Sequence, residues 1–413
     1  MMQWFYNILI KFAEVILWLP ALFDQKIKLG QTGRKSTFKI LEEHIQSDDR
    51  VVWMHCASLG EFEQGRPVLE RIKIQFPKYK ILLTFFSPSG YEHRKNYPHA
   101  HVVCYLPLDT RTNAKRFLRL VHPDISIFVK YEFWPNYLYE LSKSRSKTLL
   151  ISAVISNKSL WYRNMKNKFA ALLNVFDHIF VQDKATQNLL EELGIQSNIH
   201  LAGDTRIDRT LSIANNVKPI PELREFCDTE NVLVAGSTWP EDEKVISTLV
   251  NSEVFKGWKL ICAPHHISEP HIKDIEKRFH NSLRYSRVHD LLPEHRVLII
   301  DNIGMLNKIY QYGKLAYIGG GFGSGIHNTL EPAAFGLPVI FGPRYDKFVE
   351  ATALIQSNGA FSISKDPELI AVFDKLSDIN THQRASDAVR SFMKRNRGAT
   401  DKIIVILDKE NSI

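Results

Sequence analysis

The chain alternates twice between short β-branched apolar runs and helical stretches, and this alternation constrains its fold more than any other feature. The runs are apolar at consecutive positions, which is typical of strands buried on both faces of a parallel sheet. The first series of predicted strands comprises Val51–Cys56, Lys80–Phe86, Val102–Leu106, Ile125–Val129, Leu149–Val154 and His178–Gln182, with helices such as Phe62–Phe76, Thr112–Val121 and Ala185–Leu193 between them. After a pause at Gly203–Pro221, the second series comprises Asn231–Gly236, Lys259–Ala263, Val297–Asp301, Leu315–Ile318 and Pro338–Phe341.

Two such series predict an α/β chain with two Rossmann-like, doubly wound domains. The 413 residues also suit two domains of ordinary size. The predicted divisions are a domain at 24–208, a linker at 209–220, a second domain at 221–380, and C-terminal helices at 381–413 that pack across the domains. Ligands of such sheets bind beyond the carboxyl ends of the strands, so we expect the two domains to face a ligand-binding cleft.

The first 23 residues (MMQWFYNILIKFAEVILWLPALF) are mostly apolar and rich in aromatic side chains. They lack the basic start and small-residue cleavage site of a signal peptide. Lys26, Lys28, Arg34 and Lys35 follow them. Aromatic residues followed by cations favour a helix that lies on, or inserts into, the cytoplasmic face of a membrane; a core helix of the first domain is the alternative.

The formal net charge of +8 favours an anionic partner. Nucleic acid, a phosphorylated substrate, an acidic membrane surface and a merely solvated basic surface all fit this charge. The basic residues are scattered and carry no nucleic-acid-binding motif, which disfavours nucleic acid. The four cysteines form no CxxC pair, so we predict no disulfide framework and no zinc site.

Two acidic residues in the first half follow predicted strands. In Ser58–Glu61 (SLGE), Glu61 stands at capping-box spacing from Ser58 and also at a strand end, where a carboxylate could take a proton from an attacking hydroxyl. The sequence supports the capping role and the catalytic role of Glu61 about equally. In Tyr131–Asn136 (YEFWPN), Glu132 stands beside large aromatic residues that can raise a carboxyl pKa, although Pro135 also fits a simple helix start.

In the second half, Ser237 and Thr238 follow a predicted strand and could bind phosphate or cap a helix. His265 and His266 follow the next strand, but adjacent histidines without a third ligand make a metal site improbable. The segment Gly319–Pro343 (GGGFGSGIHNTLEPAAFGLPVIFGP) is the strongest candidate for an anion site. Its glycines open a strand-to-helix junction to a ligand, although their spacing matches neither a P-loop nor a dinucleotide fingerprint.

The segments described above resemble those of a known family. HNTLEPAAFGLPVIFGP is similar to the nucleotide-binding signature of the bacterial 3-deoxy-D-manno-octulosonic acid (Kdo) transferases of glycosyltransferase family 30. The resemblance extends nearly end to end, because the remaining motifs have counterparts in the same order. They are the apolar N-terminus, SLGE, TFFSPSG, YLPLD, YEFWPN, ISAVISNKS, AGDTRID and AGST.

The resemblance implies a GT-B fold with the acceptor in the N-terminal domain and CMP-Kdo in the C-terminal domain. It implies inverting, metal-independent transfer of Kdo to a lipid A precursor at the cytoplasmic side of the inner membrane, with no cofactor. Glu61 would be the general base and Glu132 a second catalytic glutamate. The implied CMP contacts fall on Pro264, His265, Ile303, Gly304, Met305, Asn328, Thr329, Leu330 and Glu331, and Ser237 and Thr238 could join them at the phosphate.

The chain departs from the family pattern at two places. The usual Pro-Arg-His is Pro264-His265-His266, and a neutral histidine stabilises a leaving phosphate less than arginine does. The usual Met-Gly-Glu is Ile303-Gly304-Met305, which loses a carboxylate. Two other functions fit the same motifs: a different GT-B sugar-nucleotide enzyme such as an epimerase, and a non-catalytic lipid-binding relative.

Overall fold

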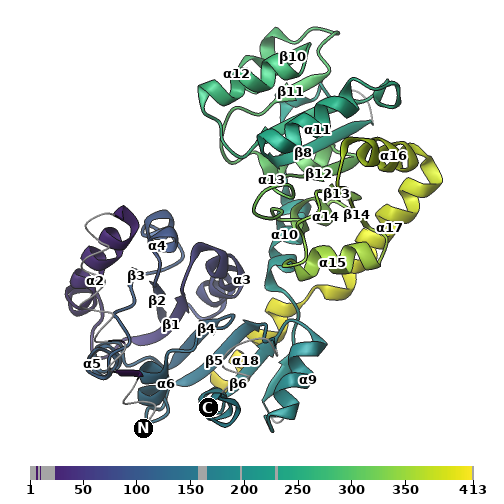
Figure 1. Cartoon of the computed structure of the whole chain (residues 1–413). Coiled ribbons are helices and arrows are strands. Elements are labelled where there is room, and N and C mark those ends of the chain that lie inside the picture. The colour runs from purple at the N-terminus through teal and green to yellow at the C-terminus, as the bar shows by residue number, and fades with distance from the viewer. Residues whose placement is uncertain are drawn as a thin grey trace. The chain divides into compact units, whose positions relative to one another are not determined.

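The computed structural model describes residues 6–7, 10, 24–156, 165–195, 198–227 and 231–411. The chain divides into two compact units, Met1–Asp208 with Arg397–Ile413, and Arg209–Asn396. Each unit is a parallel sheet with helices packed against it (Figure 1). The expected membrane-associated helix at 1–23 lies outside the described residues except for Tyr6, Asn7 and Ile10. Within the described ranges, no helix has the length and apolar character needed to cross a bilayer.

The sheet of the first unit has seven parallel strands in the order β3-β2-β1-β4-β5-β6-β7. The strands are β1 (Arg50–Cys56), β2 (Tyr79–Phe85), β3 (Val102–Tyr105), β4 (Ile125–Val129), β5 (Lys147–Ala153), β6 (His178–Val181) and β7 (Ile199–Leu201). The helices are α2 (Gln25–His44), α3 (Leu59–Gln75), α4 (Pro88–Arg94), α5 (Arg111–Val121), α6 (Pro135–Leu141), α8 (Lys166–Leu173), α9 (Lys184–Glu192) and α18 (Ala399–Asn411), and α10 (Thr205–Asn216) crosses the boundary into the second unit. The strand order reverses between β1 and β4, which is where such sheets place their ligands.

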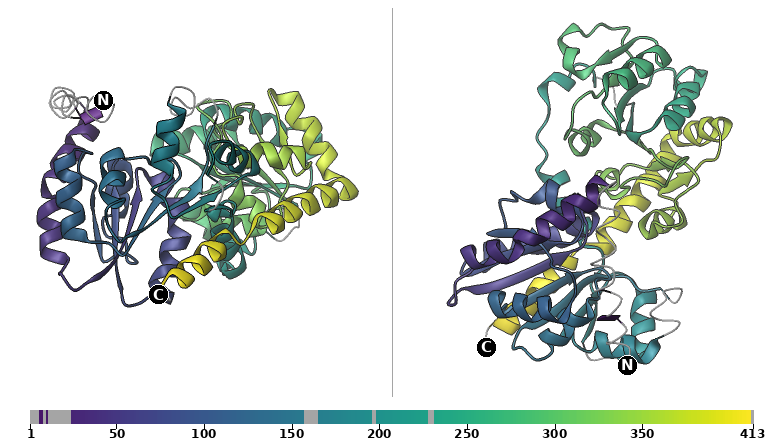
Figure 2. Two further views of the ribbon diagram at one scale, coloured as in Figure 1. Left: turned by 90° about the horizontal axis from the view of Figure 1, so that it is seen from below. Right: turned by 60° about the vertical axis from the view of Figure 1, so that its left-hand side comes forward.

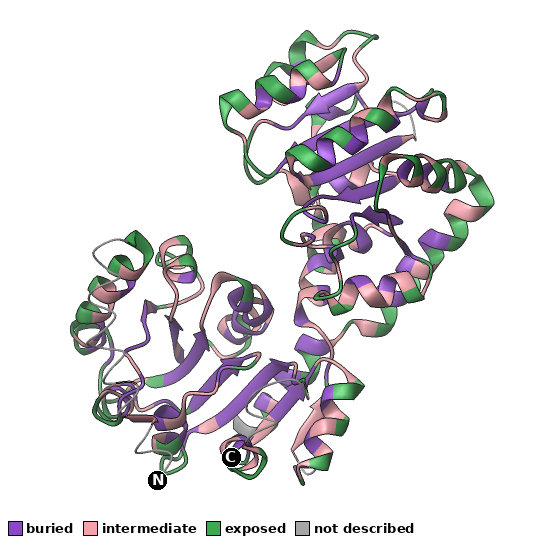
Figure 3. Cartoon of the chain, viewed as in Figure 1, coloured by how far each residue is buried: buried purple, intermediate pink, exposed green. Residues whose placement is uncertain are grey.

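Successive residues of the central strands enter different hydrophobic clusters. Trp53 and Phe128 belong to one cluster, whereas Met54 and Ile127 belong to the other. All four side chains are fully buried, and Figure 3 shows the strands as buried throughout most of their length. The prediction that these apolar runs are strands covered on both faces is therefore confirmed.

The second unit repeats this architecture with the strand order β10-β11-β9-β8-β12-β13-β14. The strands are β8 (Val232–Thr238), β9 (Lys259–Pro264), β10 (Ser282–Arg284), β11 (Val297–Ile299), β12 (Leu315–Ile318), β13 (Val339–Phe341) and β14 (Ala360–Ser362). The helices are α11 (Pro240–Val250), α12 (Glu269–Arg278), α13 (Leu306–Ile309), α14 (Leu330–Ala334), α15 (Val349–Gln356), α16 (Asp366–Ser377) and α17 (Ile379–Asn396). Here the strand order reverses between β8 and β12.

The C-terminal helices, yellow in Figure 2, belong to different units. Helix α17 ends the second unit, whereas α18 returns to the first unit and buries Ile403 and Leu407 in its core. The carboxylate of Asp208 accepts backbone hydrogen bonds from Gly398 (2.6 Å) and Thr400 (2.7 Å), which fixes the start of α18. Helix α10 covers residues 205–216 and so includes most of the segment 209–220 that is expected to link the domains.

Candidate functional site

Glu61 lies in the first turn of α3, directly beyond the carboxyl end of β1. Its Oε2 atom accepts a hydrogen bond from the backbone N–H of Ser58 at 3.1 Å, so the carboxylate returns to the helix start as the capping-box spacing predicts. The residue is only 6% exposed. Both readings of the sequence therefore describe one side chain, which caps a helix and is also a buried acid at the edge of the sheet.

Glu132 follows β4, the strand that pairs with β1 in register through His55 and Phe128. The chain turns sharply at Lys130, whose φ of 74° is rare for a residue with a side chain. After this turn, Glu132 is 8% exposed and accepts a hydrogen bond from the Trp134 indole N–H at 2.8 Å. Its Oε2 atom also lies 3.7 Å from Nε2 of the fully buried His55.

Burial raises the pKa of Glu61 to about 7, and the negative charge of Glu132 adds to this effect. The backbone donors at Ala57 and Ser58 and the charge of Lys130 oppose the increase. A carboxyl group with this pKa is substantially ionised at neutral pH yet still binds protons well. This balance is what a general base needs.

In the second unit, the predicted glycine-rich loop follows β12, and its first glycines are required by backbone packing. A Cβ atom on Gly319 would lie 2.6 Å from Cα of Thr238, and one on Gly321 would lie 2.6 Å from Cα of Gly342. Gly320 (φ 92°) and Gly325 (φ 135°) have backbone conformations that side chains disfavour. The loop thus crosses the ends of β8 and β13 at distances that only glycine allows.

Asp242, in the first turn of α11, anchors this loop through hydrogen bonds. The side chain is fully buried, and its Oδ2 atom accepts backbone hydrogen bonds from Gly320 (2.8 Å) and Trp239 (3.0 Å). Its Oδ1 atom accepts a hydrogen bond from the Tyr317 hydroxyl at 2.8 Å. One carboxylate therefore joins the end of β8, the end of β12 and the glycine-rich loop.

Three aromatic rings from separate loops stack at the carboxyl ends of the central strands. The ring of His265 lies between those of Trp239 (centroids 4.7 Å apart) and His327 (4.6 Å), and the rings are nearly parallel. The Trp239 indole N–H also donates a hydrogen bond to Nε2 of His327 at 3.1 Å. Burial and the neighbouring His265 lower the pKa of His327 to about 4, while burial and His266 lower that of His265.

The remaining predicted donor contacts lie around this stack. Ser237 has a φ of 54° at an irregularity in β8. The Thr238 side chain is fully buried and donates its hydroxyl hydrogen to Glu243 at 3.1 Å, so this hydroxyl is committed to the interior of the unit. Pro264 is buried at the end of β9, and His265 follows it with an exposed side chain.

Two further groups of predicted contacts form loops beside β11 and α14. Ile303 is 88% exposed, Gly304 has a φ of 92°, and Met305 precedes α13. Asn328 donates to Oε1 of Glu331 at 3.0 Å and accepts the backbone N–H of Leu330 at 3.0 Å. Thr329 is fully buried, and its hydroxyl has no hydrogen-bond partner among the residues that the structure describes. A short helix of five residues, α14, starts here.

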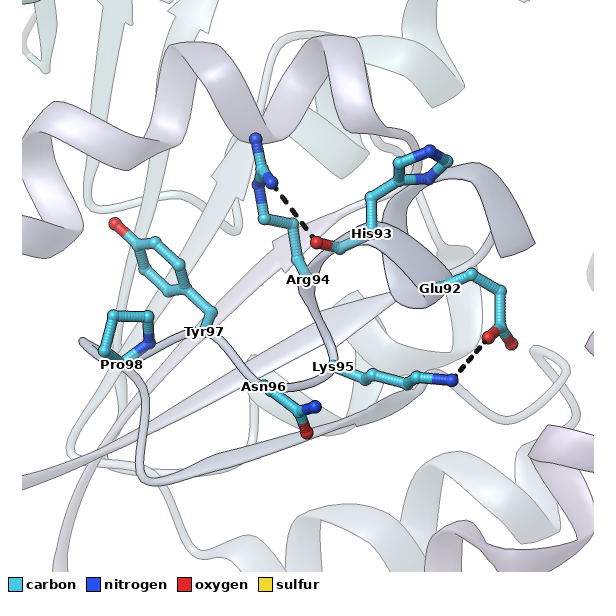
Figure 4. Close-up of a pocket in the computed structure, with 7 residues that line it drawn as sticks. All are labelled: Glu92, His93, Arg94, Lys95, Asn96, Tyr97 and Pro98. Carbon is cyan, nitrogen blue, oxygen red and sulfur yellow. Dashed lines mark hydrogen bonds and ion pairs between the residues drawn. The ribbon is translucent and has the colours of Figure 1, made fainter. Parts of the chain in front are cut away.

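A small pocket of about 190 Å³ in the first unit lies outside all predicted site residues (Figure 4). It is lined by Glu92–Pro98, and its charged side chains already have partners within the unit: Lys95 pairs with Glu92, and Arg94 with Glu63. In the described part of the chain, no three His, Cys, Asp or Glu side chains converge as a metal site would require.

Sequence reasoning missed His55, Trp239 and Asp242. His55 reads as an ordinary strand residue because its partner Glu132 is far away in the sequence. Trp239 and Asp242 share capping-box spacing at the start of α11, which was the available signal. The stack of Trp239 with two histidines could not be predicted from the sequence, because its three rings come from loops that are separate in the chain.

Comparison with known proteins identifies the family of the chain. Residues 31–209 match a family model described as 3-Deoxy-D-manno-octulosonic-acid transferase (kdotransferase). The 3-deoxy-D-manno-octulosonic acid transferase of Rickettsia prowazekii is 30% identical over 340 residues, which cover 80% of this chain and 72% of that protein. The protein of the same name from Chlamydia trachomatis serovar A is 27% identical over 390 residues, covering 91% of this chain and 89% of that protein.

Solved structures support the fold. UDP-GlcNAc 2-epimerase from Neisseria meningitidis, bound to UDP-GlcNAc, aligns with a TM-score of 0.62 at 14% identity, covering 87% of this chain and all of that one. A glycosyltransferase from Rickettsia africae aligns with a TM-score of 0.55 at 11% identity, covering 88% of this chain and 98% of that one. At these identities the likeness shows a GT-B-like pair of α/β domains. The identity to the curated relatives, over most of both chains, shows more: this chain belongs to the Kdo transferase family and is a glycosyltransferase that transfers Kdo.

Proposed function

We propose that the chain transfers Kdo from CMP-Kdo to the lipid A precursor lipid IVA, with inversion at the anomeric carbon and Glu61 as the general base. The observation that carries this proposal is the state of Glu61. It is a buried carboxyl group at the strand-order reversal of the first sheet, with a pKa of about 7 and a second carboxyl group, Glu132, beside it.

The proposed step moves one proton and one pair of bonding electrons. A primary hydroxyl of the acceptor sugar attacks the anomeric carbon of Kdo, and a new C–O bond forms as the bond to the CMP phosphate breaks. The hydroxyl proton passes to the Glu61 carboxylate, and the bonding electrons leave with the phosphate of CMP. Attack from the face opposite CMP inverts the anomeric centre, and none of these steps requires a metal ion.

The second unit would hold the donor. Parallel sheets of this type bind ligands beyond the carboxyl ends of their strands, and Ser237, Thr238 and Pro264 end β8 and β9. Burial lowers the pKa of both His265 and His327, and ring N–H groups of these residues would donate to the departing phosphate. Binding CMP-Kdo through these residues, with Asn328 and Glu331 on the nucleoside, completes the proposed donor site.

The acceptor places the proposed reaction at a membrane. Lipid IVA resides in a bilayer, and the apolar, aromatic N-terminus followed by lysine and arginine residues suits the cytoplasmic side of the inner membrane. Helix α2 presents Lys26, Lys28 and Lys35 within its first turns.

The test is a transfer assay with freshly generated CMP-Kdo and lipid IVA, in which mass spectrometry counts the sugars added. We expect Kdo on lipid IVA for the wild-type chain, and at least a 1000-fold loss of turnover for Glu61→Gln with CMP binding retained. Glu63→Gln is the matched control, because Glu63 lies on the same helix but forms a partly buried ion pair with Arg94. We expect near-normal turnover for this control.

Three results would contradict the proposal. Turnover of Glu61→Gln near the wild-type rate would remove Glu61 as the base. Conversion of UDP-GlcNAc without any Kdo transfer would favour the epimerase alternative. Binding of lipid IVA without CMP release would favour the non-catalytic alternative.

A further inference from the structure

His55 is a fully buried imidazole in the first unit that faces Glu132. It lies next to the end of β1, with Thr84 of β2 and Phe128 of β4 as its register partners. Its Nδ1 atom lies 2.9 Å from Oγ1 of Thr84. Its Nε2 atom is buried without a hydrogen-bond partner in the described chain and lies 3.7 Å from Oε2 of Glu132. The ring is wedged edge-on against Phe128 and Trp134.

The neighbours of Thr84 indicate which nitrogen of His55 carries hydrogen. The Trp53 indole N–H donates to Oγ1 of Thr84 at 2.8 Å. The single hydroxyl hydrogen of Thr84 can point to Nδ1 of His55 at 2.9 Å or to the carbonyl oxygen of Met54 at 3.5 Å. The shorter distance favours Nδ1, so a neutral His55 carries its hydrogen on Nε2. A charged ring would also present N–H there, so either form directs a donor at Glu132.

We propose that His55 is a positioning residue that directs a buried N–H group at the Glu132 carboxylate and so fixes the place of this negative charge beside Glu61. This inference rests on the proposed role of Glu61. Oε2 of Glu132 accepts the Trp134 N–H at 2.8 Å and faces the His55 N–H, and donors to a carboxylate favour its charged form. Without His55, the Trp134 N–H is the remaining hydrogen-bond donor to this oxygen among the described residues.

Other charged or titratable groups also face the pair. Burial and the charges of both glutamates raise the pKa of the Cys56 thiol well above its usual range, so this thiol stays neutral. Lys130 lowers the pKa of Glu61, whereas the pKa of Tyr131 is raised by burial first and then by both glutamates. Glu63 adds negative charge near Cys56. None of these groups donates a hydrogen bond to Glu132 in the described chain; Trp134 does, and Nε2 of His55 lies 3.7 Å away.

Two isosteric substitutions separate the role of the donor from that of packing. The amide of His55→Gln reaches the position of Nε2 and keeps an N–H towards Glu132. The amide of His55→Asn reaches only the position of Nδ1, so it keeps the Thr84 side and loses the donor to Glu132. Both variants remove the same ring, so a role in packing alone would affect them alike.

The readout is the acidic limb of the pH profile of kcat/KM for Kdo transfer by the full chain. The negative charge of Glu132 raises the pKa of Glu61, so a variant in which the Glu132 carboxylate leaves its place lowers that pKa. We expect the limb of His55→Asn to move about one pH unit lower and that of His55→Gln to stay within about 0.3 units of wild type. Glu132→Gln removes the neighbouring charge and should move the limb lower, whatever its effect on the maximal rate.

An unmoved limb in His55→Asn, together with an inactive Glu61→Gln, would overturn this inference alone. An active Glu61→Gln would instead overturn the proposed function. The tautomer of wild-type His55 gives a second test that needs no variant, by long-range 15N–1H NMR at pH 7.5. A hydrogen on Nε2 is expected, and a bare Nε2 at that pH would overturn the inference.

Discussion

Replacing Gly319 with alanine tests how closely the glycine-rich loop, where it leaves β12, approaches the end of β8. A Cβ atom there would lie 2.6 Å from Cα of Thr238 and 2.8 Å from the carbonyl carbon of Ser237, and nearer still to the Ser237 oxygen. Ordinary contacts between such atoms are about 3.5–4.0 Å, so the backbones must separate by about 1 Å. The hydrogen bond from the Gly319 N–H to the Gly236 oxygen (2.9 Å) resists that movement.

The loss of stability in Gly319→Ala depends on which atoms must move to make room for the Cβ atom. Overpacking a core costs about 1–3 kcal/mol when side chains can adjust, and here the obstacles are backbone atoms, so we expect about 3 kcal/mol or more. For a unit of this size, about 1 kcal/mol shifts Tm by about 2–4 °C, which predicts a decrease of about 6–12 °C. Calorimetry of the full chain would measure this shift.

Gly323 offers a matched control in the same loop. A Cβ atom on Gly323 would lie 3.6 Å from the Gly320 oxygen, which is an ordinary contact. We therefore expect Gly323→Ala to melt within about 2 °C of wild type. If Gly319→Ala also melts within that range, the two strands do not approach as closely as described, and the reasoning is refuted.

Two further predictions concern titration. The native pKa of Glu61 is about 7 against 4.5 when unfolded, so the native state binds this proton more tightly and wild-type stability falls as pH rises between these values. Glu61→Gln should therefore be more stable than wild type at pH 8, by at most about 3 kcal/mol, and equal to it near pH 4, as urea unfolding would show; a less stable variant at pH 8 would contradict the raised pKa. Binding of the CMP phosphate should raise the lowered pKa values of His265 and His327, so calorimetry should find that the affinity for CMP rises about three-fold or more from pH 8 to pH 6. The affinity of His265→Asn should depend less on pH. Equal pH dependence in the wild type and this variant would exclude a role of His265 in binding the phosphate.

The sequence predicted the parts of the fold that depend on local pattern. Strands such as Ile125–Val129 and Leu315–Ile318 are observed with the predicted bounds, because continuous apolar runs between helices admit few other structures. The three-residue strands β7, β10 and β14 were not predicted. They are too short for a periodicity, and residues such as Ile199 and Arg284 remain partly exposed at the ends of the sheets.

The sequence predicted those residues of the candidate site that lie within one short motif. Glu61 and Glu132 were found because each follows a strand directly. The ion-pair distance between His55 and Glu132 depends on the pairing of β1 with β4, which no local pattern encodes. The glycines of the loop were predicted to serve a ligand, whereas Gly319 and Gly321 are already required by the crossing of backbones within the unit.

The return of α18 to the first unit has a consequence for biosynthesis. The core of that unit lacks Ile403 and Leu407 until the last residues leave the ribosome. At about 5–20 residues per second, synthesis of the intervening segment takes on the order of 10–40 s, during which apolar surface of the first unit stays uncovered. We therefore expect chaperones to bind the nascent chain before its synthesis is complete. A fragment that ends at Asp208 should aggregate under conditions in which the whole protein does not.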